Sequence, residues 1–128
     1  MANWSGGASV VGYIYKVGGA AGAVPFSFNE PAALGDTDNT AMYVVALEAV
    51  DEELLCRVVP LRPGDTVDIY CDAAVGLTSW ICLPAGGIGT VGQGDVEAAH
   101  VANRAIGVPM EATGGAGLCS VMIWAPHD

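Results

Sequence analysis

The stretch Thr66-Val67-Asp68-Ile69-Tyr70-Cys71 decides how this chain is expected to fold. Its residues Val67, Ile69 and Cys71 alternate with more polar ones, so they share one face of an extended strand. Just before it, Pro63-Gly64 has the chemistry of a type II turn, in which proline fixes the first central φ and glycine accepts the positive second φ. The sequence therefore predicts a tight turn that leads into a half-buried strand.

Working outward, further runs rich in β-branched and aromatic residues predict strands at 10–17, 41–49, 54–60, 77–83, 105–110 and 118–124. Residues 95–104 predict the only helix, because Asp95 suits a cap and Arg104 at the far end suits the helix dipole. The expected fold is mainly β, a small barrel or sandwich with at most one short helix.

A chain of 128 residues has the length of a single domain. Residues 1–9 are small and predict a flexible N-terminal arm, whose deletion should leave the domain folded. Residues 10–128 form a single β domain. Within it, residues 18–39 predict an extended loop that is rich in glycine, alanine and proline, with Phe26 and Phe28 as its only large apolar groups.

Charge limits the partners. Fourteen acidic residues face four Lys and Arg, which gives a formal net charge of −10. Nucleic acid binding needs clustered basic residues, and an anionic membrane surface would repel this chain, so we expect neither as a partner. No stretch approaches the roughly 20 apolar residues of a membrane span. Hydrophobic residues nevertheless make up 52% of the chain, which predicts burial against other protein.

No motif in the sequence strongly indicates a catalytic, cofactor-binding or metal-binding site. Residues 87–92 match G-x-G-x-x-G, but Pro84 and Ala85 separate them from the preceding strand and too little chain follows for a dinucleotide-binding domain. Residues 36–39 begin like a calcium loop and lack its later glycine and acid. His100 and His127 stand alone. The four cysteines, each in an apolar run, are expected to be buried reduced thiols. We expect no catalytic, cofactor-binding or metal-ligating residues and no enzymatic activity.

Aromatic residues of the extended segments are the first candidate interface anchors, and two tyrosines of the strand at 10–17 come next, because aromatic residues such as Trp and Tyr are enriched at interface hot spots. Those we select are Trp4, Tyr13, Tyr15, Phe26 and Phe28.

Three segments carry a family resemblance: RPGDTV at residues 62–67, AIGVPMEA at 105–112 and GGAGLCSV at 114–121. This pattern of a P-G-D turn before a strand, then two strands around a glycine turn, resembles the small capsid cement proteins of tailed bacteriophages. The likeness covers about residues 62–124, and the chain before residue 60 does not match.

The resemblance implies a non-enzymatic decoration protein on the outside of an icosahedral phage head. It would bind the major capsid protein and its own copies, as a trimer or a dimer, after assembly in the bacterial host cytoplasm. Two alternatives stay open. One is another virion component, such as a tail, spike or head-fibre base protein. The other is a β domain that binds a small ligand or carbohydrate on Trp80 or Trp124.

Overall fold

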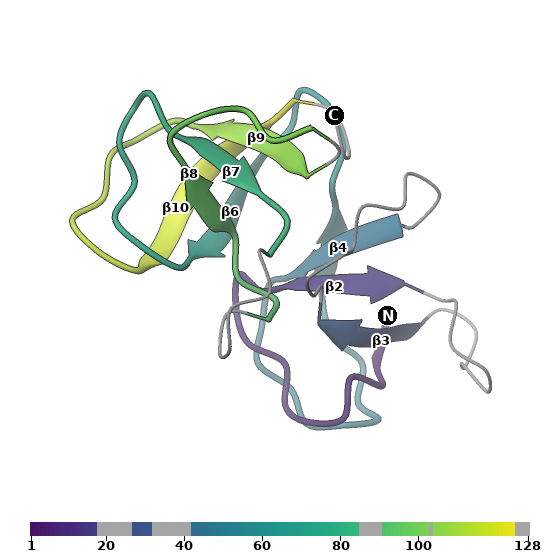
Figure 1. Ribbon diagram of the computed structural model, residues 1–128. Coiled ribbons are helices and arrows are strands. Elements are labelled where there is room, and N and C mark those ends of the chain that lie inside the picture. Colours follow the sequence, from purple (N-terminus) through teal and green to yellow (C-terminus); the bar gives the residue numbers. More distant parts are fainter. Residues whose placement is uncertain (18–26, 32–41, 85–90, 103, 125–128) are drawn as a thin grey trace.

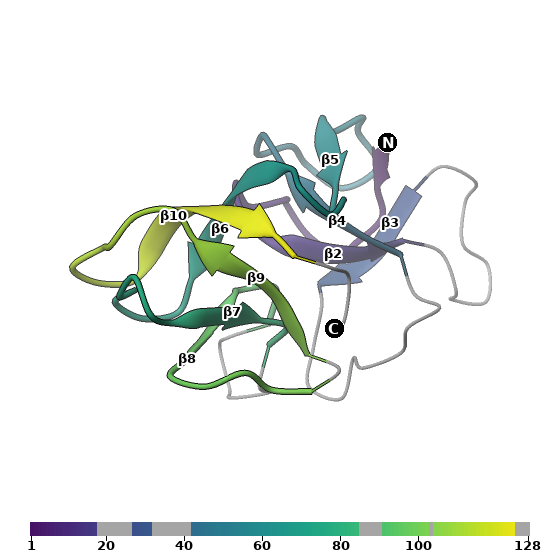
Figure 2. The same cartoon turned by 90° about the horizontal axis from the view of Figure 1, so that it is seen from above.

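The chain folds into two curled β-sheets that lie against each other (Figure 1). The computed structural model describes residues 1–17, 27–31, 42–84, 91–102 and 104–124, and of residues 29–31 the backbone alone. Within these ranges the elements are all strands, so the expected mainly β barrel or sandwich is confirmed. Figure 2 shows the two sheets from above, with β6 to β10 on one side and β2 to β5 on the other.

Each sheet has five strands within the described ranges. Sheet A has the order β1-β3-β2-β4-β5, and sheet B has the order β6-β10-β9-β7-β8. The bounds in sheet A are β1 Ala2–Asn3, β2 Ile14–Val17, β3 Ser27–Pro31, β4 Met42–Ala46 and β5 Val58–Pro60. Those in sheet B are β6 Thr66–Cys71, β7 Trp80–Cys82, β8 Asp95–Glu97, β9 Ala105–Pro109 and β10 Gly117–Ile123.

The predicted turn and strand at the start of sheet B are confirmed. The amide of Asp65 donates to the carbonyl of Arg62 at 3.1 Å, and Gly64 has φ +88°, as a type II turn requires. In β6 the side chains alternate between exposed and buried, and Val67, Ile69 and Cys71 point into the core. Strand β10 pairs antiparallel with β6 on one side and with β9 on the other.

Gly94 lets sheet B close on itself. Its amide donates to the carbonyl of Tyr70 at 2.8 Å, and its own carbonyl accepts from Asp72 at 2.9 Å, so the start of β8 reaches back to β6. A Cβ at this position would lie 2.9 Å from Ile69 and 3.0 Å from Ile81. Only glycine allows the strands to approach this closely, and the result is barrel-like.

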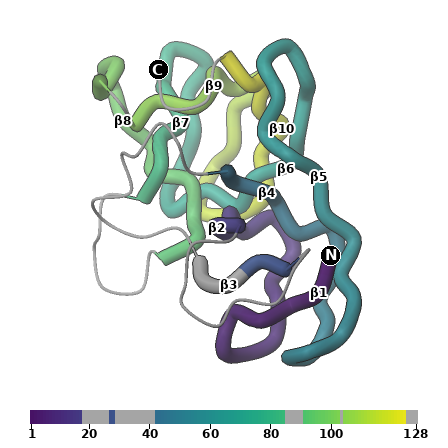
Figure 3. The backbone as a smooth tube through the Cα atoms, turned by 90° about the vertical axis from the view of Figure 1, so that its right-hand side faces the viewer, coloured from purple at the N-terminus to yellow at the C-terminus, as the bar shows by residue number. Residues whose placement is uncertain are grey.

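The N-terminus closes sheet A in a similar way. Strand β1 runs parallel to β3, and on its other side the segment before β5 bonds to it (Figure 3). The amide of Asn3 donates to Leu54 at 2.8 Å, and the amide of Cys56 donates to Met1 at 2.7 Å. The expected flexible arm at residues 1–9 therefore contains a paired strand, because the backbone groups of β1 find partners on both sides.

Two clusters of buried side chains fill the structure. The larger lies between the sheets and joins Ile14, Tyr43 and Val45 of sheet A to Ile69, Ile81 and Val121 of sheet B. The smaller lies on the opposite face of sheet A. Its buried members are Tyr15, Phe28, Val44, Ala46 and Cys56, with Met1 packed against them. Because the larger cluster takes residues from both sheets, the described ranges form one domain.

The predicted helix at 95–104 is wrong. Asp95–Glu97 forms β8, which pairs antiparallel with β7, and the residues that follow turn toward β9. The acid at the start and the base at the end suggested a helix dipole. In the structure they are an ion pair instead, with Arg104 Nη2 2.6 Å from Asp95 Oδ2. Pairing with β7 and this ion pair stabilise the observed conformation more than the weak helix propensity of residues 95–104 would stabilise a helix.

The expected loop at 18–39 contains a strand. Residues 27–31 form β3, which lies between β1 and β2. The rest of the expected loop, 18–26 and 32–39, lies outside the described residues. The strand was missed because Phe28 is its one large apolar side chain, and a single residue carries no periodicity.

Candidate functional site

Two of the five predicted anchors belong to the core of this chain. Tyr15 and Phe28 are 2% and 0% exposed, and their rings pack with centroids 4.7 Å apart. The Tyr15 hydroxyl accepts a hydrogen bond from the amide of Val10 at 3.0 Å, and burial raises the pKa of Tyr15. Both side chains hold the interior of sheet A and present little surface to a partner.

The other predicted anchors differ from one another. Trp4 follows β1 and is 38% exposed, so its ring is available to a partner. Tyr13 is half-buried where the two sheets meet: its ring lies 5.6 Å from that of Tyr70, and its hydroxyl accepts from Gln93 at 2.9 Å. Phe26 lies outside the described residues.

Large apolar side chains are exposed on both sheets. Leu55 is 77% exposed, and Leu54 and Leu47 lie on the same part of sheet A. On sheet B, Leu77, Met110 and Leu118 are exposed beside the turn that joins β9 to β10. The exposed leucines of sheet A could have been found from the sequence. Leu54 and Leu55 directly follow three acids, and two leucines in such a polar segment indicate a contact with another protein.

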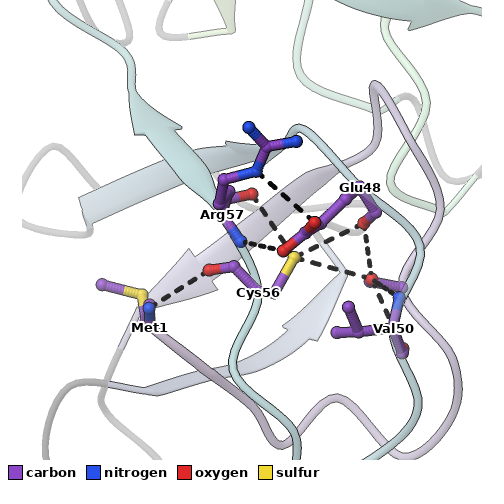
Figure 4. Close-up of polar contacts among 6 residues, drawn as sticks. Met1, Glu48, Val50, Cys56 and Arg57 are labelled. Atoms are coloured by element: carbon purple, nitrogen blue, oxygen red, sulfur yellow. Dashed lines mark hydrogen bonds and ion pairs between the residues drawn. The ribbon is translucent and has the colours of Figure 1, made fainter.

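A shallow groove of about 460 Å³ lies beside β5. It is lined by Met1, Leu47, Glu48, Leu55, Cys56, Arg57 and Val58. Figure 4 shows the polar contacts that hold it: the Cys56 carbonyl accepts from the N-terminal amine of Met1 at 3.1 Å, and the Glu48 carboxylate accepts from the Arg57 amide at 2.9 Å. The Glu48–Arg57 ion pair is largely exposed and contributes little stability.

Three aromatic rings meet on the outer face of sheet B. The Trp80 ring of β7 lies 5.0 Å from that of His100 and 6.1 Å from that of Trp124, both in edge arrangements. Because Ile81 points into the core, its neighbour Trp80 points outward. Trp124 is 55% exposed and follows directly after β10. The sequence places these rings far apart, and the sheet brings them together.

Glu97, the register partner of Trp80, belongs to a group of acidic side chains, and we call Asp72, Asp95 and Glu97 the acidic cluster. Asp95 accepts from Arg104 and Asp72 accepts from the amide of Val96, and the carboxyls of Asp72 and Glu97 both lie close to that of Asp95. Burial and the neighbouring carboxyls raise the pKa of both Asp72 and Asp95. Within the described residues, no group of His, Cys, Asp and Glu side chains is placed to hold a metal ion.

The four cysteines are buried and unbridged, as expected. Burial raises the pKa of the Cys71 thiol to about 12 and that of Cys82 to about 11, and it also raises the pKa of Cys119. A buried thiol that resists ionisation is a poor nucleophile. In the described ranges there is also no helix of the length and hydropathy needed to cross a membrane.

Comparison with known proteins gives no match: no family model, no curated protein and no solved structure is similar to this chain at a significant level.

Proposed function

We propose that this chain is a non-enzymatic cement protein, which decorates the outside of an icosahedral phage head and holds neighbouring major capsid proteins together. The observation that carries the proposal is the exposure of large apolar side chains on both sheets, from Leu55 at 77% to Leu77 at 69% and Trp124 at 55%. Exposed apolar groups of this size at separate ends of a small domain suit a protein that contacts more than one neighbour.

The segments that resemble the cement family support the proposal by their arrangement. Residues 62–67 form the turn into β6, residues 105–112 include β9, and residues 114–121 include most of β10. In sheet B these strands are direct neighbours in the order β6-β10-β9. The three separate segments of the resemblance therefore build one continuous piece of sheet.

Charge supports the outer surface as the location. A net charge of −10 would be repelled by packaged DNA, whereas it is tolerated on the outside of a filled head and keeps a highly concentrated protein soluble. The partners we propose are the major capsid protein and further copies of this chain in a trimer or a dimer. Assembly would take place in the bacterial host cytoplasm.

Particle purification tests the proposal. Phage heads purified by gentle lysis and gradient sedimentation should carry this chain in a number of copies that matches the capsid lattice. A few copies per particle would instead indicate a tail, spike or fibre-base protein. The absence of the chain from every particle fraction would reject a virion role.

A second candidate is a domain that binds a carbohydrate or another small ligand. It is favoured by the meeting of the half-buried Trp80 with the exposed Trp124, whose rings offer an apolar surface for a sugar ring. Thermal-shift measurements against sugars and nucleotides separate the two candidates, because a decoration subunit should respond to none of them.

A further inference from the structure

The outer face of sheet B combines a half-buried tryptophan, Trp80, and an exposed one, Trp124, with negative charge. Glu97 of β8 is the direct register partner of Trp80 in β7. Directly paired residues in neighbouring strands place their side chains on the same face of the sheet. The Glu97 carboxyl therefore lies beside the Trp80 ring, which in turn contacts the rings of His100 and Trp124.

Among the described residues, the carboxyls of the acidic cluster outnumber the cations paired with them. The cluster supplies three carboxyls, and Arg104 is the guanidinium that faces them. Arg104 donates both to Asp95 at 2.6 Å and to the carbonyl of Leu83 at 2.9 Å, so its donors are directed to the inner end of the cluster. Glu97 is the member of the cluster that pairs in register with Trp80.

An indole face beside a carboxylate suits a cation. Tryptophan binds cations on its face better than the other aromatic residues do, and arginine can stack on a ring while it donates to a carboxylate. A second copy of this chain is a poor source of that cation. It has only four Lys and Arg, of which Arg57 and Arg104 already pair with acids.

We propose that the face around Trp80, Trp124 and Glu97 docks an arginine or lysine side chain from a basic patch of a different protein. The inference rests on the proposed function, in which that protein is the capsid subunit. The contact should weaken with salt, because it joins opposite charges at a partly exposed site. It should strengthen as the pH rises, because the raised pKa values of Asp72 and Asp95 leave the cluster less negative in acid.

The first test measures co-sedimentation of the purified protein with phage heads that have been stripped of this chain. Trp124→Ala and Glu97→Gln should each weaken binding by about fivefold or more. Asp51→Asn is the matched control, because it removes one charge from an exposed site on the sheet A side. Trp124→Phe should restore part of the affinity lost in Trp124→Ala. Wild-type affinity in both Trp124→Ala and Glu97→Gln would overturn the inference while leaving the proposed function standing.

The second test needs no capsid. N-acetyl-arginine amide is titrated into the full chain while the tryptophan indole resonances are followed by NMR, with N-acetyl-glutamine amide as the neutral control. Trp80 and Trp124 should shift with the arginine probe, less so in Glu97→Gln and at high salt. Equal shifts with both probes, or none with either, would overturn the inference. This outcome does not depend on whether the wild-type protein binds heads. Saturable binding of a sugar without a response to arginine would favour the second candidate function instead.

Discussion

At some glycine positions the packing leaves no space for a side chain. A Cβ added to Gly107 in β9 would lie 2.4 Å from the Met122 carbonyl oxygen and 2.7 Å from Val121. Because both contacts are in the centre of sheet B, we expect Gly107→Ala to lower the free energy of unfolding by about 1–3 kcal/mol. Urea denaturation measures the effect. Gly114→Ala is the control, since its Cβ would meet nothing within 4 Å, and equal losses in the two variants would contradict the packing argument.

The cysteines make a second prediction at this scale. With pKa values of about 12 and about 11, the Cys71 and Cys82 thiols hold almost no thiolate at pH 8, and both are fully buried. Iodoacetamide should therefore leave them unmodified in the native protein and label them rapidly in guanidinium chloride, as read by peptide mass spectrometry. Fast labelling of native Cys71 would show that the core between the sheets opens readily.

At the scale of elements, β1 depends on the side chain of Asn3. Its amide donates to the carbonyls of Gly7 and Val50, and its oxygen accepts from Ser5. We expect Asn3→Ala to cost about 1–3 kcal/mol of unfolding free energy, because the fully buried Asn3 side chain loses its hydrogen bonds to these partners. Leu55→Ser changes a side chain that is 77% exposed and should stay within about 0.5 kcal/mol of wild type. An Asn3→Ala variant as stable as wild type would mean that the side-chain hydrogen bonds of Asn3 contribute nothing to the stability of β1.

The acidic cluster makes the stability of β8 depend on pH. The pKa values of Asp72 and Asp95 are raised in the folded state, so folding favours their protonated forms. Their contribution is complete below the ordinary carboxyl pKa and is lost as the pH rises through the raised values. We expect the urea midpoint to fall as the pH rises from about 4 toward neutrality. Asp72→Asn should flatten this profile, whereas the exposed control Asp65→Asn should not.

For the whole molecule, the shared core predicts a single unfolding transition. Trp80 and Trp124 report on sheet B, and Trp4 reports on the N-terminal end of sheet A. Because both sheets bury side chains in one cluster, the fluorescence of a Trp4→Phe variant should follow the same urea curve as the far-UV circular dichroism of the whole chain. Two separated transitions would show that sheet A and sheet B unfold independently.

Local patterns in the sequence were enough to predict two kinds of strand. These are strands whose paired neighbours lie close in the chain and strands whose side chains alternate between apolar and polar. The Pro63-Gly64 turn, β6 and the β9–β10 pair were predicted in this way, because backbone preference and period-2 alternation act over a few residues. The mainly β architecture and the buried cysteines follow from the same local signals.

Only the tertiary structure decided the contacts that join distant segments. It made β1 and β3 into strands, turned Tyr15 and Phe28 into core residues, and replaced the expected helix with β8. It also brought Trp80, Trp124 and Glu97 to one face of sheet B. The physical reason is that a strand is stabilised by hydrogen bonds and burial against partners far away in the chain, and no short window of sequence contains those partners.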